Sequence, residues 1–357
     1  MTNSVESRVF SLVKPGTIEE TKKIREIPKG WVAIEPTYAS ICHADLRYFA
    51  GLRRPEALAK KLPMALLHEG IGIVKETSSE KFKIGDRVVV VPNIPGQILH
   101  PEINQKPEVP VNYSKGNAFL GSGYDGMAQS RLVHPESCLV LIPAEIPDEI
   151  AVLSELSSVS HHAISHVKEK LENPETKVAL FGDGPVGYFT AVMLKYLYGV
   201  DAERFVVFGA SDDKLAQFYF ARTGNVLSYD FENSKEKFDV LIECTGGKFS
   251  QSALNQAIEI ADSLADIIFM GVTEELVPID TRDILEKGIT AHGSSRSSTS
   301  DFEAVIKGMM KPDYRTALSK ILPEQVSEIS TGEDFKKVME KFVANPGWKK
   351  TVMHFNW

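Results

Sequence analysis

Four side chains in this sequence have the chemistry of metal ligands. Cys42, His68, Glu69 and Glu155 together offer one sulfur, one nitrogen and two carboxylate groups, a set that suits zinc. Each of them alone has an ordinary explanation, since a single cysteine is more often a small buried hydrophobe. An adjacent histidine and glutamate beside an apolar strand is less ordinary, because charged residues are rarely buried without a partner. The combination predicts one catalytic zinc site.

A glycine-rich turn later in the chain has the spacing of a dinucleotide-binding site. Gly182, Gly184 and Gly187 stand in a G-x-G-x-x-G pattern that also contains Pro185 and Val186. The first glycine allows a tight turn, the second lets a pyrophosphate approach the backbone, and the third lets the following helix pack closely. The pattern follows an apolar strand and opens a helix, so it predicts that a dinucleotide binds at the helix N-terminus.

The next expected strand indicates which dinucleotide is bound. An NAD-binding chain usually ends this strand in an acid that bonds the ribose hydroxyl, whereas here the strand ends in Gly209. Ser211 and Lys214 lie just beyond it and can supply a hydroxyl and a positive charge to a 2′-phosphate. Arg296 is a further candidate cation, and Thr245 follows a later strand of the same domain. These residues favour NADPH.

Two nearby acids leave an alternative open. After a small shift in register, Asp212 or Asp213 would hold the ribose and restore a preference for NAD. If the absence of an acid at the end of this strand determines the cofactor preference, placing aspartate at Gly209 shifts that preference toward NADH, because a carboxylate repels the 2′-phosphate.

The bulk properties exclude several classes of protein. A net charge of −8 and a pI near 5.7 argue against a nucleic-acid binder. Three cysteines form no disulfide framework and fit a reducing compartment. The first residues lack the apolar core of a signal peptide, and no apolar run approaches the roughly 18 residues of a membrane span. We therefore expect a cytoplasmic protein with no membrane or nucleic-acid partner.

The elements that position these residues divide the chain into two kinds of structure. The first 150 or so residues contain β-branched runs broken by glycine, proline and charged turns, which is typical of strands. From about Glu149 short apolar runs alternate with helical patterns, which predicts a parallel sheet covered on both faces. A chain of 357 residues is also long enough for two domains. The fold class is therefore α/β with a β-rich first domain.

These motifs, taken in order, resemble the zinc-dependent medium-chain dehydrogenases. The resemblance runs through ICHAD, HEGIG, FKIGDRV, GYDGMAQSRLV, SELSSVSHHA, FGDGPVG and HGSSRSS. It implies that Cys42 and His68 are zinc ligands, that Glu69 is a direct or exchangeable ligand, and that Glu155 occupies the fourth-ligand position of the polyol-dehydrogenase branch. It also implies a GroES-like catalytic domain (1–151), a Rossmann domain (152–292) and a return of the chain to the catalytic domain (293–357).

Two departures from this family affect the chemistry. The family often holds a structural zinc with clustered cysteines, but residues 92–125 contain none, so we expect no second zinc. The family's proton relay often starts from Ser or Thr, whereas Ala44 stands here and cannot transfer a proton. The proton donor would then be a water at the zinc assisted by Glu69 or Glu155, or the hydroxyl of Tyr48. The absence of a relay hydroxyl at Ala44 would also fit a protein that binds the cofactor but has no catalytic activity.

The expected ligands carry more negative charge than the ion can neutralise. If all four bind at once, one thiolate and two carboxylates exceed Zn²⁺ by one negative charge. Such a site is a weak electrophile. We therefore expect one carboxylate to leave when a substrate oxygen arrives.

A basic segment lies between the two ligand motifs and could bind an anionic substrate. It contains Arg47, Arg53 and Arg54 together with Lys60 and Lys61. Arginines hold phosphate groups through paired hydrogen bonds, so the three arginines are candidates for the phosphate of a phosphorylated polyol or ketose. A solvated helix face is the other explanation of the same charges.

Within the superfamily, the chain is most similar to the ribitol-5-phosphate dehydrogenases, also called ribulose-5-phosphate reductases. This similarity rests on the ASICHADLRYF motif, the lobe without cysteines and the cofactor strand that ends in Gly209. The resemblance implies reversible reduction of D-ribulose 5-phosphate by NADPH to ribitol 5-phosphate, for CDP-ribitol and wall teichoic acid or capsule synthesis. Many relatives are homodimers, which we expect here too. The alternative is a dehydrogenase of an unphosphorylated polyol or secondary alcohol.

Overall fold

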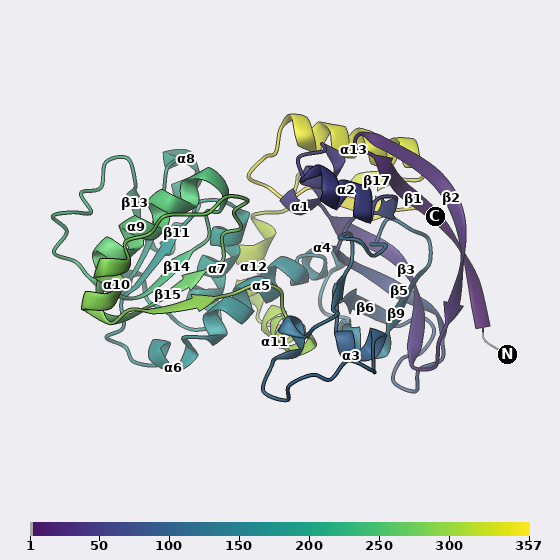
Figure 1. Cartoon of the computed structure of the whole chain (residues 1–357), viewed down its shortest axis with the longest axis horizontal. Helices are drawn as coiled ribbons and strands as arrows, with labels where there is room; N and C mark the ends of the chain where they lie inside the picture. The colour runs from purple at the N-terminus through teal and green to yellow at the C-terminus, as the bar shows by residue number, and fades with distance from the viewer. Residues whose placement is uncertain (1–2) are drawn as a thin grey trace. The chain divides into compact units, whose positions relative to one another are not determined.

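The structure is a computed structural model that describes residues 3–357, and the chain forms two compact units (Figure 1). The first unit runs to Ser158 and resumes from Ser297 to Trp357, and the second comprises Val159–Arg296. The sequence places these divisions a few residues earlier, after residues 151 and 292. Helix α5 (Ser154–Ser165) begins in the first unit and ends in the second.

The first unit contains a seven-stranded sheet in the order β10-β6-β5-β3-β18-β17, with β9 also pairing with β3. The last strand of the chain lies against one of the first, since Val352 pairs with Ser40. The strands are β3 (Trp31–Ser40), β5 (Glu69–Thr77), β6 (Arg87–Val90), β9 (Leu132–Pro135), β10 (Leu139–Leu141), β17 (Ser327–Ile329) and β18 (Val352–Phe355).

A smaller sheet and several helices complete this unit. A long hairpin of β1 (Asn3–Lys14) and β2 (Thr17–Ile27) turns at Gly16, and β1 also pairs with β4 (Met64–Ala65). The helices are α1 (His43–Phe49), α2 (Pro55–Lys61), α3 (Gly96–Leu99), α4 (Asp148–Ala151), α11 (Thr299–Met309), α12 (Pro312–Ser319) and α13 (Gly332–Ala344), with 3₁₀ turns at Val111–Tyr113 and Glu136–Cys138.

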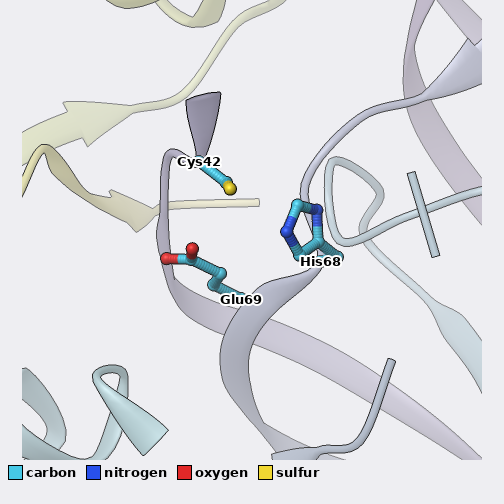
Figure 2. Close-up of side chains that lie close together, drawn as sticks. All are labelled: Cys42, His68 and Glu69. Carbon is cyan, nitrogen blue, oxygen red and sulfur yellow. The ribbon is translucent and has the colours of Figure 1, made fainter. Parts of the chain in front are cut away.

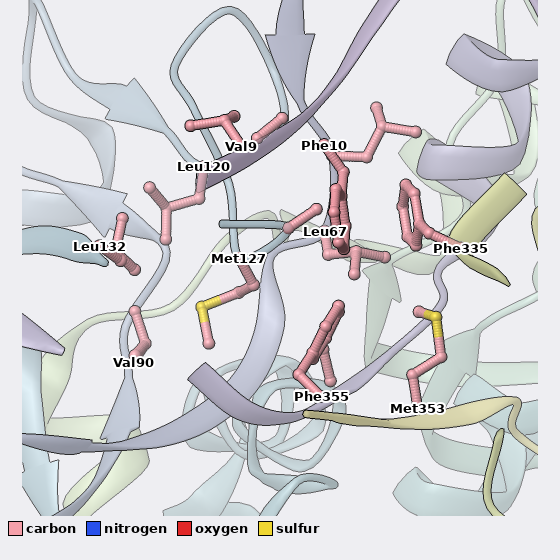
Figure 3. Packing of buried hydrophobic residues seen from close by; sticks show 14 of the residues in the cluster. Val9, Phe10, Leu67, Val90, Leu120, Met127, Leu132, Phe335, Met353 and Phe355 are labelled. Atoms are coloured by element: carbon pink, nitrogen blue, oxygen red, sulfur yellow. The ribbon is translucent and has the colours of Figure 1, made fainter. Parts of the chain in front are cut away.

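The core of the first unit joins residues from both ends of the chain (Figure 3). Phe10 of β1 stacks on Phe335 of α13 with ring centroids 6.0 Å apart, and Met353 and Phe355 of β18 belong to the same cluster. Leu67, the residue before His68, is fully buried in it. Burial of apolar surface therefore fixes the backbone on which the expected metal ligands lie.

The lobe without cysteines is held by side-chain amides. The Asn117 carbonyl oxygen accepts a hydrogen bond from the Gly96 N–H (2.7 Å), and its amide donates to the carbonyls of Val111 and Asn112. A two-stranded pairing of β7 (Asn93–Ile94) with β8 (Ala118–Phe119) closes the lobe. These bonds supply the order that turn chemistry gives to irregular chain.

The second unit is a six-stranded parallel sheet in the order β13-β12-β11-β14-β15-β16. This is the doubly wound Rossmann order, in which β11 and β14 flank the point where ligands bind. The strands are β11 (Val178–Phe181), β12 (Phe205–Gly209), β13 (Arg222–Asn225), β14 (Phe238–Glu243), β15 (Ala261–Phe269) and β16 (Thr290–Gly293). The helices are α6 (Lys168–Leu171), α7 (Pro185–Tyr196), α8 (Asp212–Leu215), α9 (Ser250–Ile260) and α10 (Thr281–Lys287), with 3₁₀ turns at Ala202–Arg204 and Gly247–Phe249.

The apolar strand β15 lies inside this sheet. β15 pairs with β14 on one side and with β16 on the other, so β13 and β16 form the edges. None of the helices within residues 3–357 is both long and apolar enough to cross a bilayer.

Candidate metal centre and cofactor site

Cys42 lies where β3 passes into helix α1. It is the N-cap residue of that helix, and its backbone N–H donates a hydrogen bond to the carboxylate of Asp45 (3.0 Å). An acid three residues into a helix satisfies a backbone donor that has no partner within the helix. Asp45 therefore holds the turn that carries the cysteine.

The same aspartate also fixes His68. Its other oxygen accepts the Leu67 N–H (3.0 Å) and lies 3.7 Å from Nδ1 of His68. Leu67 has a φ of +74°, which is unusual for a branched side chain and requires support from its surroundings. Asp45 provides that support on one side, and the N–H of Met127 bonds the Leu67 carbonyl (2.8 Å) on the other.

Glu69, at the start of β5, is almost completely buried and has two partners on one oxygen. The Ser40 hydroxyl donates to Oε2, and Nζ of Lys350 lies 2.5 Å from the same atom. Lys350 is itself 7% exposed and donates a second bond to the carbonyl of Ile41 (2.8 Å). The other oxygen, Oε1, is buried without a hydrogen-bond partner. That atom is therefore available to a ligand.

Three of the four expected ligands come together. Ligand atoms of Cys42, His68 and Glu69 all lie within 4.8 Å of one another, and their side chains face a common space (Figure 2). Sulfur, imidazole nitrogen and carboxylate oxygen form a donor set that zinc accepts, and a catalytic site keeps a further position for water or substrate. The unpartnered Oε1 of Glu69 fits the same interpretation.

Glu155, the fourth expected ligand, lies outside this 4.8 Å group, at the start of α5. Its side chain is buried, and burial raises its pKa to about 7. The charge of His68 lowers the pKa of Glu155 and that of Glu69 raises it, so Glu155 belongs to the same electrostatic environment. A carboxyl with such a pKa exchanges protons near neutral pH.

The charges around the three ligands support one another. Burial alone would lower the pKa of His68, but the Asp45 carboxylate raises it well above its usual value. Burial also disfavours the charged form of Lys350, yet Glu69 raises its pKa. Lys350 adds one positive charge that the count from the sequence lacks. With this lysine included, the thiolate and two carboxylates of the four expected ligands and a divalent ion sum to zero, and the Asp45 carboxylate beside His68 adds one negative charge.

The expected phosphate and proton-transfer residues lie on α1 and on the segment after it. Tyr48 is buried, and its hydroxyl bonds to Lys61 (2.8 Å) and Ser122 (3.1 Å). Arg47 and Arg53 are half-buried, whereas Arg54 is exposed at the N-terminus of α2. Lys61 was expected only as part of a basic segment.

The glycine turn has the geometry that its sequence predicts. Gly182 has a φ of +134°, Gly184 is the N-cap of α7, and Pro185 and Val186 open the helix. A Cβ on Gly187 would lie 1.9 Å from the Gly182 carbonyl oxygen, so the helix approaches the turn too closely for any side chain. A Cβ on Gly184 would meet nothing within 4 Å, which leaves its backbone open to a pyrophosphate.

A residue inside this turn has a role that sequence reasoning missed. The Asp183 carboxylate accepts hydrogen bonds from the N–H groups of Ala210 and Ser211 (both 2.9 Å), and Lys214 lies 3.8 Å from its second oxygen. A Cβ on Gly209 would lie 2.6 Å from that of Asp183. Gly209 is therefore required for packing. Aspartate at that position would crowd Asp183, so Gly209→Asp would disturb the turn as well as place a carboxylate near the cofactor.

A buried acid ties together two further loops at the same edge of the sheet. Glu243, at the end of β14, accepts hydrogen bonds from the N–H groups of Thr245, Gly246 and Gly271, each 2.9 Å long. Parallel strands bring such loops together at their carboxyl ends. Arg296 lies in the exposed segment after β16, with a φ of +65°. The expected cofactor residues thus follow β11, β12, β14 and β16.

Comparison with known proteins agrees with this architecture. A model of the alcohol dehydrogenase GroES-like domain matches residues 28–144. Ribulose-5-phosphate reductase 1 of Staphylococcus aureus is 36% identical over 97% of this chain and 98% of its own length. The corresponding reductase of Bacillus spizizenii is 36% identical over 84% of this chain and 85% of its own length. The chain belongs to the ribulose-5-phosphate reductase family.

A solved structure extends the comparison to three dimensions. The crystal structure of S. aureus TarJ in complex with NADPH matches 99% of this chain and 100% of that chain, with 33% identity and a TM-score of 0.84. The resemblance to zinc-dependent medium-chain dehydrogenases and the expected GroES-like and Rossmann folds are thereby confirmed.

Proposed function

We propose that the protein reduces D-ribulose 5-phosphate to ribitol 5-phosphate with NADPH, the reaction that supplies CDP-ribitol for teichoic acid or capsule synthesis. The grouping of Cys42, His68 and Glu69 within 4.8 Å carries the proposal, because it supplies a metal-ligand set in a chain whose relatives are ribulose-5-phosphate reductases. A ketone becomes a better hydride acceptor when its oxygen is held by a cation.

The ligands of the metal would be Cys42, His68 and Glu69 through its unpartnered oxygen. Bound zinc would supply Lewis-acid polarisation of the substrate carbonyl. Asp45 orients the His68 ring, and Lys350 with Ser40 holds Glu69 by its other oxygen. Such supporting contacts commonly set metal affinity as strongly as the ligands themselves.

The cofactor would be NADPH, as in the TarJ complex. Bound NADPH would supply the hydride, and the chain's own contribution is to bind and orient it. The backbone at Gly182, Gly184 and Gly187 receives the pyrophosphate at the N-terminus of α7. Ser211 and Lys214 would hold the 2′-phosphate through a hydroxyl and a positive charge, on the turn that Asp183 ties down by accepting the N–H groups of Ala210 and Ser211. Thr245 and Arg296 complete the expected set.

We assign proton transfer to Glu155 in place of permanent ligation. It lies outside the group of three ligands, and its pKa of about 7 lets the carboxyl give a proton to the substrate oxygen near neutral pH. In Glu155→Gln we expect a roughly 10²-fold lower kcat with zinc content unchanged, in the range typical for loss of a general acid. Loss of zinc from this variant would make Glu155 a ligand instead.

The substrate assignment is tested by two pairs of assays. Ribulose 5-phosphate is compared with ribulose, and NADPH with NADH, using the zinc-loaded enzyme. We expect strong preference for the phosphorylated ketose and for NADPH. Equal use of ribulose and its phosphate would reject the assignment and favour a dehydrogenase of unphosphorylated polyols.

We also propose a homodimer, as expected from the sequence, with one qualification from the fold. A sheet that continues across two subunits would have to use β13 or β16, because β15 is paired on both sides. Light scattering on the purified protein checks the subunit number.

A further inference from the structure

A cluster of polar side chains near the metal ligands has no part in holding the metal. Nζ of Lys61 donates hydrogen bonds to the hydroxyl oxygens of Tyr48 (2.8 Å) and Ser122 (2.9 Å), and these oxygens lie 3.1 Å apart. The three atoms thus form a nearly equilateral triangle. An ammonium has three N–H donors, so one donor of Lys61 remains for a ligand.

The charge of this cluster is positive. None of the ion pairs among residues 3–357 includes Lys61, and its only bonded partners in the described chain are the two hydroxyls. Asp125, three residues after Ser122, is already bound by Lys23 (2.7 Å) and Arg25 (2.5 Å). An ammonium without an acid partner attracts an anion.

A second cation lies on the ring of the same tyrosine. The guanidinium carbon of Arg53 is 4.9 Å from the centroid of the Tyr48 ring, and Nζ of Lys61 is 5.5 Å from it. Burial would raise the pKa of Tyr48, but the hydrogen bonds from Lys61 and Ser122 hold it below its usual value. Tyr48 is 2% exposed, whereas Lys61 and Ser122 are half-buried, so the tyrosine forms the floor of a reachable site.

The cluster is tied to the metal ligands by two backbone connections. Tyr48 is in the helix that Cys42 opens, six residues further on, which is roughly 9 Å along the helix axis. Ser122 follows Gly121, and a Cβ on Gly121 would lie 3.1 Å from the backbone nitrogen of Leu67, next to His68. The ring of Phe119 in the same loop is 5.3 Å from that of His68.

We propose that Lys61, Tyr48 and Ser122, with Arg53 beside them, bind the phosphate group of the substrate. The inference rests on the proposed function and names the residues that read the phosphate. Five bonds separate C2 of a ketopentose 5-phosphate from its phosphorus, and an extended chain advances about 1.2 Å per bond. That reach of about 6 Å, with a hydrogen bond of about 2.9 Å added, is on the scale of the axial separation of the Cys42 and Tyr48 backbone positions.

This assignment refines the expectation that Arg47, Arg53 and Arg54 bind the phosphate. Arg54 is exposed at the start of α2, whereas Lys61 ends the same helix with its ammonium directed at two buried or half-buried hydroxyls. The third N–H of Lys61 and the hydroxyl proton not used between Tyr48 and Ser122 offer two donors to one phosphate, and the ammonium makes the binding charge-assisted.

Lys61→Met tests the proposal, with Lys60→Met as the matched control. Lys60 is the exposed neighbour in the same helix, so both variants remove one positive charge. Because a hydrogen bond to a charged group is worth roughly tenfold to a hundredfold in binding, we expect Lys61→Met to lower kcat/KM for ribulose 5-phosphate by about 30-fold or more, through KM. Turnover of ribulose should change less than about twofold, and Lys61→Arg should recover part of the loss.

Two outcomes of these assays would overturn the proposal. Equal losses in Lys61→Met for ribulose and its phosphate would indicate a structural role for the lysine. Equal behaviour of Lys61→Met and Lys60→Met would indicate a general effect of charge.

Tyr48→Phe separates phosphate binding from proton transfer. As a phosphate ligand, the hydroxyl should affect KM for ribulose 5-phosphate severalfold and leave kcat nearly unchanged. A fall of about 10²-fold in kcat for both substrates, with loss of one limb of the pH profile, would make Tyr48 the proton donor and overturn the proposal.

Inorganic phosphate distinguishes failure of the site from failure of the proposed function. It should raise the Tm of the wild-type holoenzyme and of Lys60→Met, but not that of Lys61→Met, because binding to the folded state stabilises it. If wild type reduces no phosphorylated ketose but shows this pattern, the proposed function fails and the anion site stands. If wild type reduces ribulose 5-phosphate and phosphate shifts the Tm of all three proteins equally, the anion site fails.

Discussion

The metal centre draws its groups from four distant stretches of chain, whereas the cofactor turn takes nearly all of its structure from one. Cys42, His68 with Glu69, Glu155 and Lys350 meet only after the catalytic unit has folded around them. The turn from Gly182 to Gly187 is a contiguous strand-to-helix connection whose backbone is itself the binding surface. The first site therefore depends on paired charges in the interior, and the second depends on the absence of side chains.

This difference predicts that the two sites fail independently, and the largest expected effect is at the metal. His68→Ala should lower kcat/KM by roughly 10³-fold or more, because Lewis-acid polarisation is worth several kcal/mol. Zinc content should fall with it, while NADPH affinity, measured by fluorescence, stays within about twofold of wild type. Cys42→Ala should behave alike. Loss of NADPH binding in these variants would contradict the separation.

The complementary experiment changes the cofactor turn and leaves the metal centre intact, through the substitution Gly187→Val. The added side chain begins 1.9 Å from a backbone oxygen that cannot rotate away, and overpacking of this kind costs about 1–3 kcal/mol or more. We expect NADPH affinity to fall at least tenfold, in line with that cost, while zinc content remains near wild type. Gly347→Ala, whose Cβ would approach only the Lys349 nitrogen at 3.9 Å and which lies in the other unit, is the control and should bind NADPH normally.

Lys350→Met sharpens the comparison at the charged site. Removing one partner of a buried pair leaves an unpaired carboxylate, which costs roughly 3–5 kcal/mol of stability. Zinc affinity and activity should fall by about 10–100-fold, as for other supporting contacts. Lys349→Met removes a half-exposed neighbour from a 3.7 Å pair with Glu324 and should do little. Comparable effects of the two variants would reject a special role for Lys350.

The smallest expected effect is a dependence of stability on pH. In chelator-treated protein the raised pKa of His68 stabilises the fold below pH 6.5 and is lost as pH rises through the folded value. The lowered pKa of Asp45 stabilises the fold above pH 3.8 and is lost as pH falls through its folded value. The pair thus contributes fully between these limits, and Tm should decline as pH rises above 6.5.

The zinc-loaded protein should show the opposite trend over the same range, because protons compete with the metal for His68. Asp45→Asn should remove the decline in the metal-free protein. Parallel pH profiles for loaded and metal-free protein would show that His68 does not bind the metal.

The contrast also explains what could be predicted from the sequence. The glycine turn was predictable because it is short and contiguous, so the spacing of its glycines in the sequence determines its geometry. Cys42, His68 and Glu69 were predictable as ligand types, since few other residue types bind zinc. Lys350 was not, because nothing in the GWKKTV stretch distinguishes a buried lysine from its exposed neighbour.

Asp183 illustrates the same limit on the cofactor side. Its place inside a known motif marks it as a turn residue, and its bonds to the strand after Gly209 appear only when β11 and β12 are paired. The strand-end glycine was therefore interpreted only as a missing acid, although it also leaves the space that the Asp183 side chain occupies. Similarly, the role that we propose for Lys61 depends on its hydrogen bond to Ser122, a residue 61 positions away in the sequence.

The position of Lys350, just before strand β18, links the charge balance of the metal centre to the pairing of that strand. Because Val352 and Met353 of β18 pair with Ser40 and Ala39 of β3, displacement of β18 would take Lys350 away from Glu69 as well. Fraying of one strand would thus leave the buried carboxylate without its cation while every metal ligand stays in place.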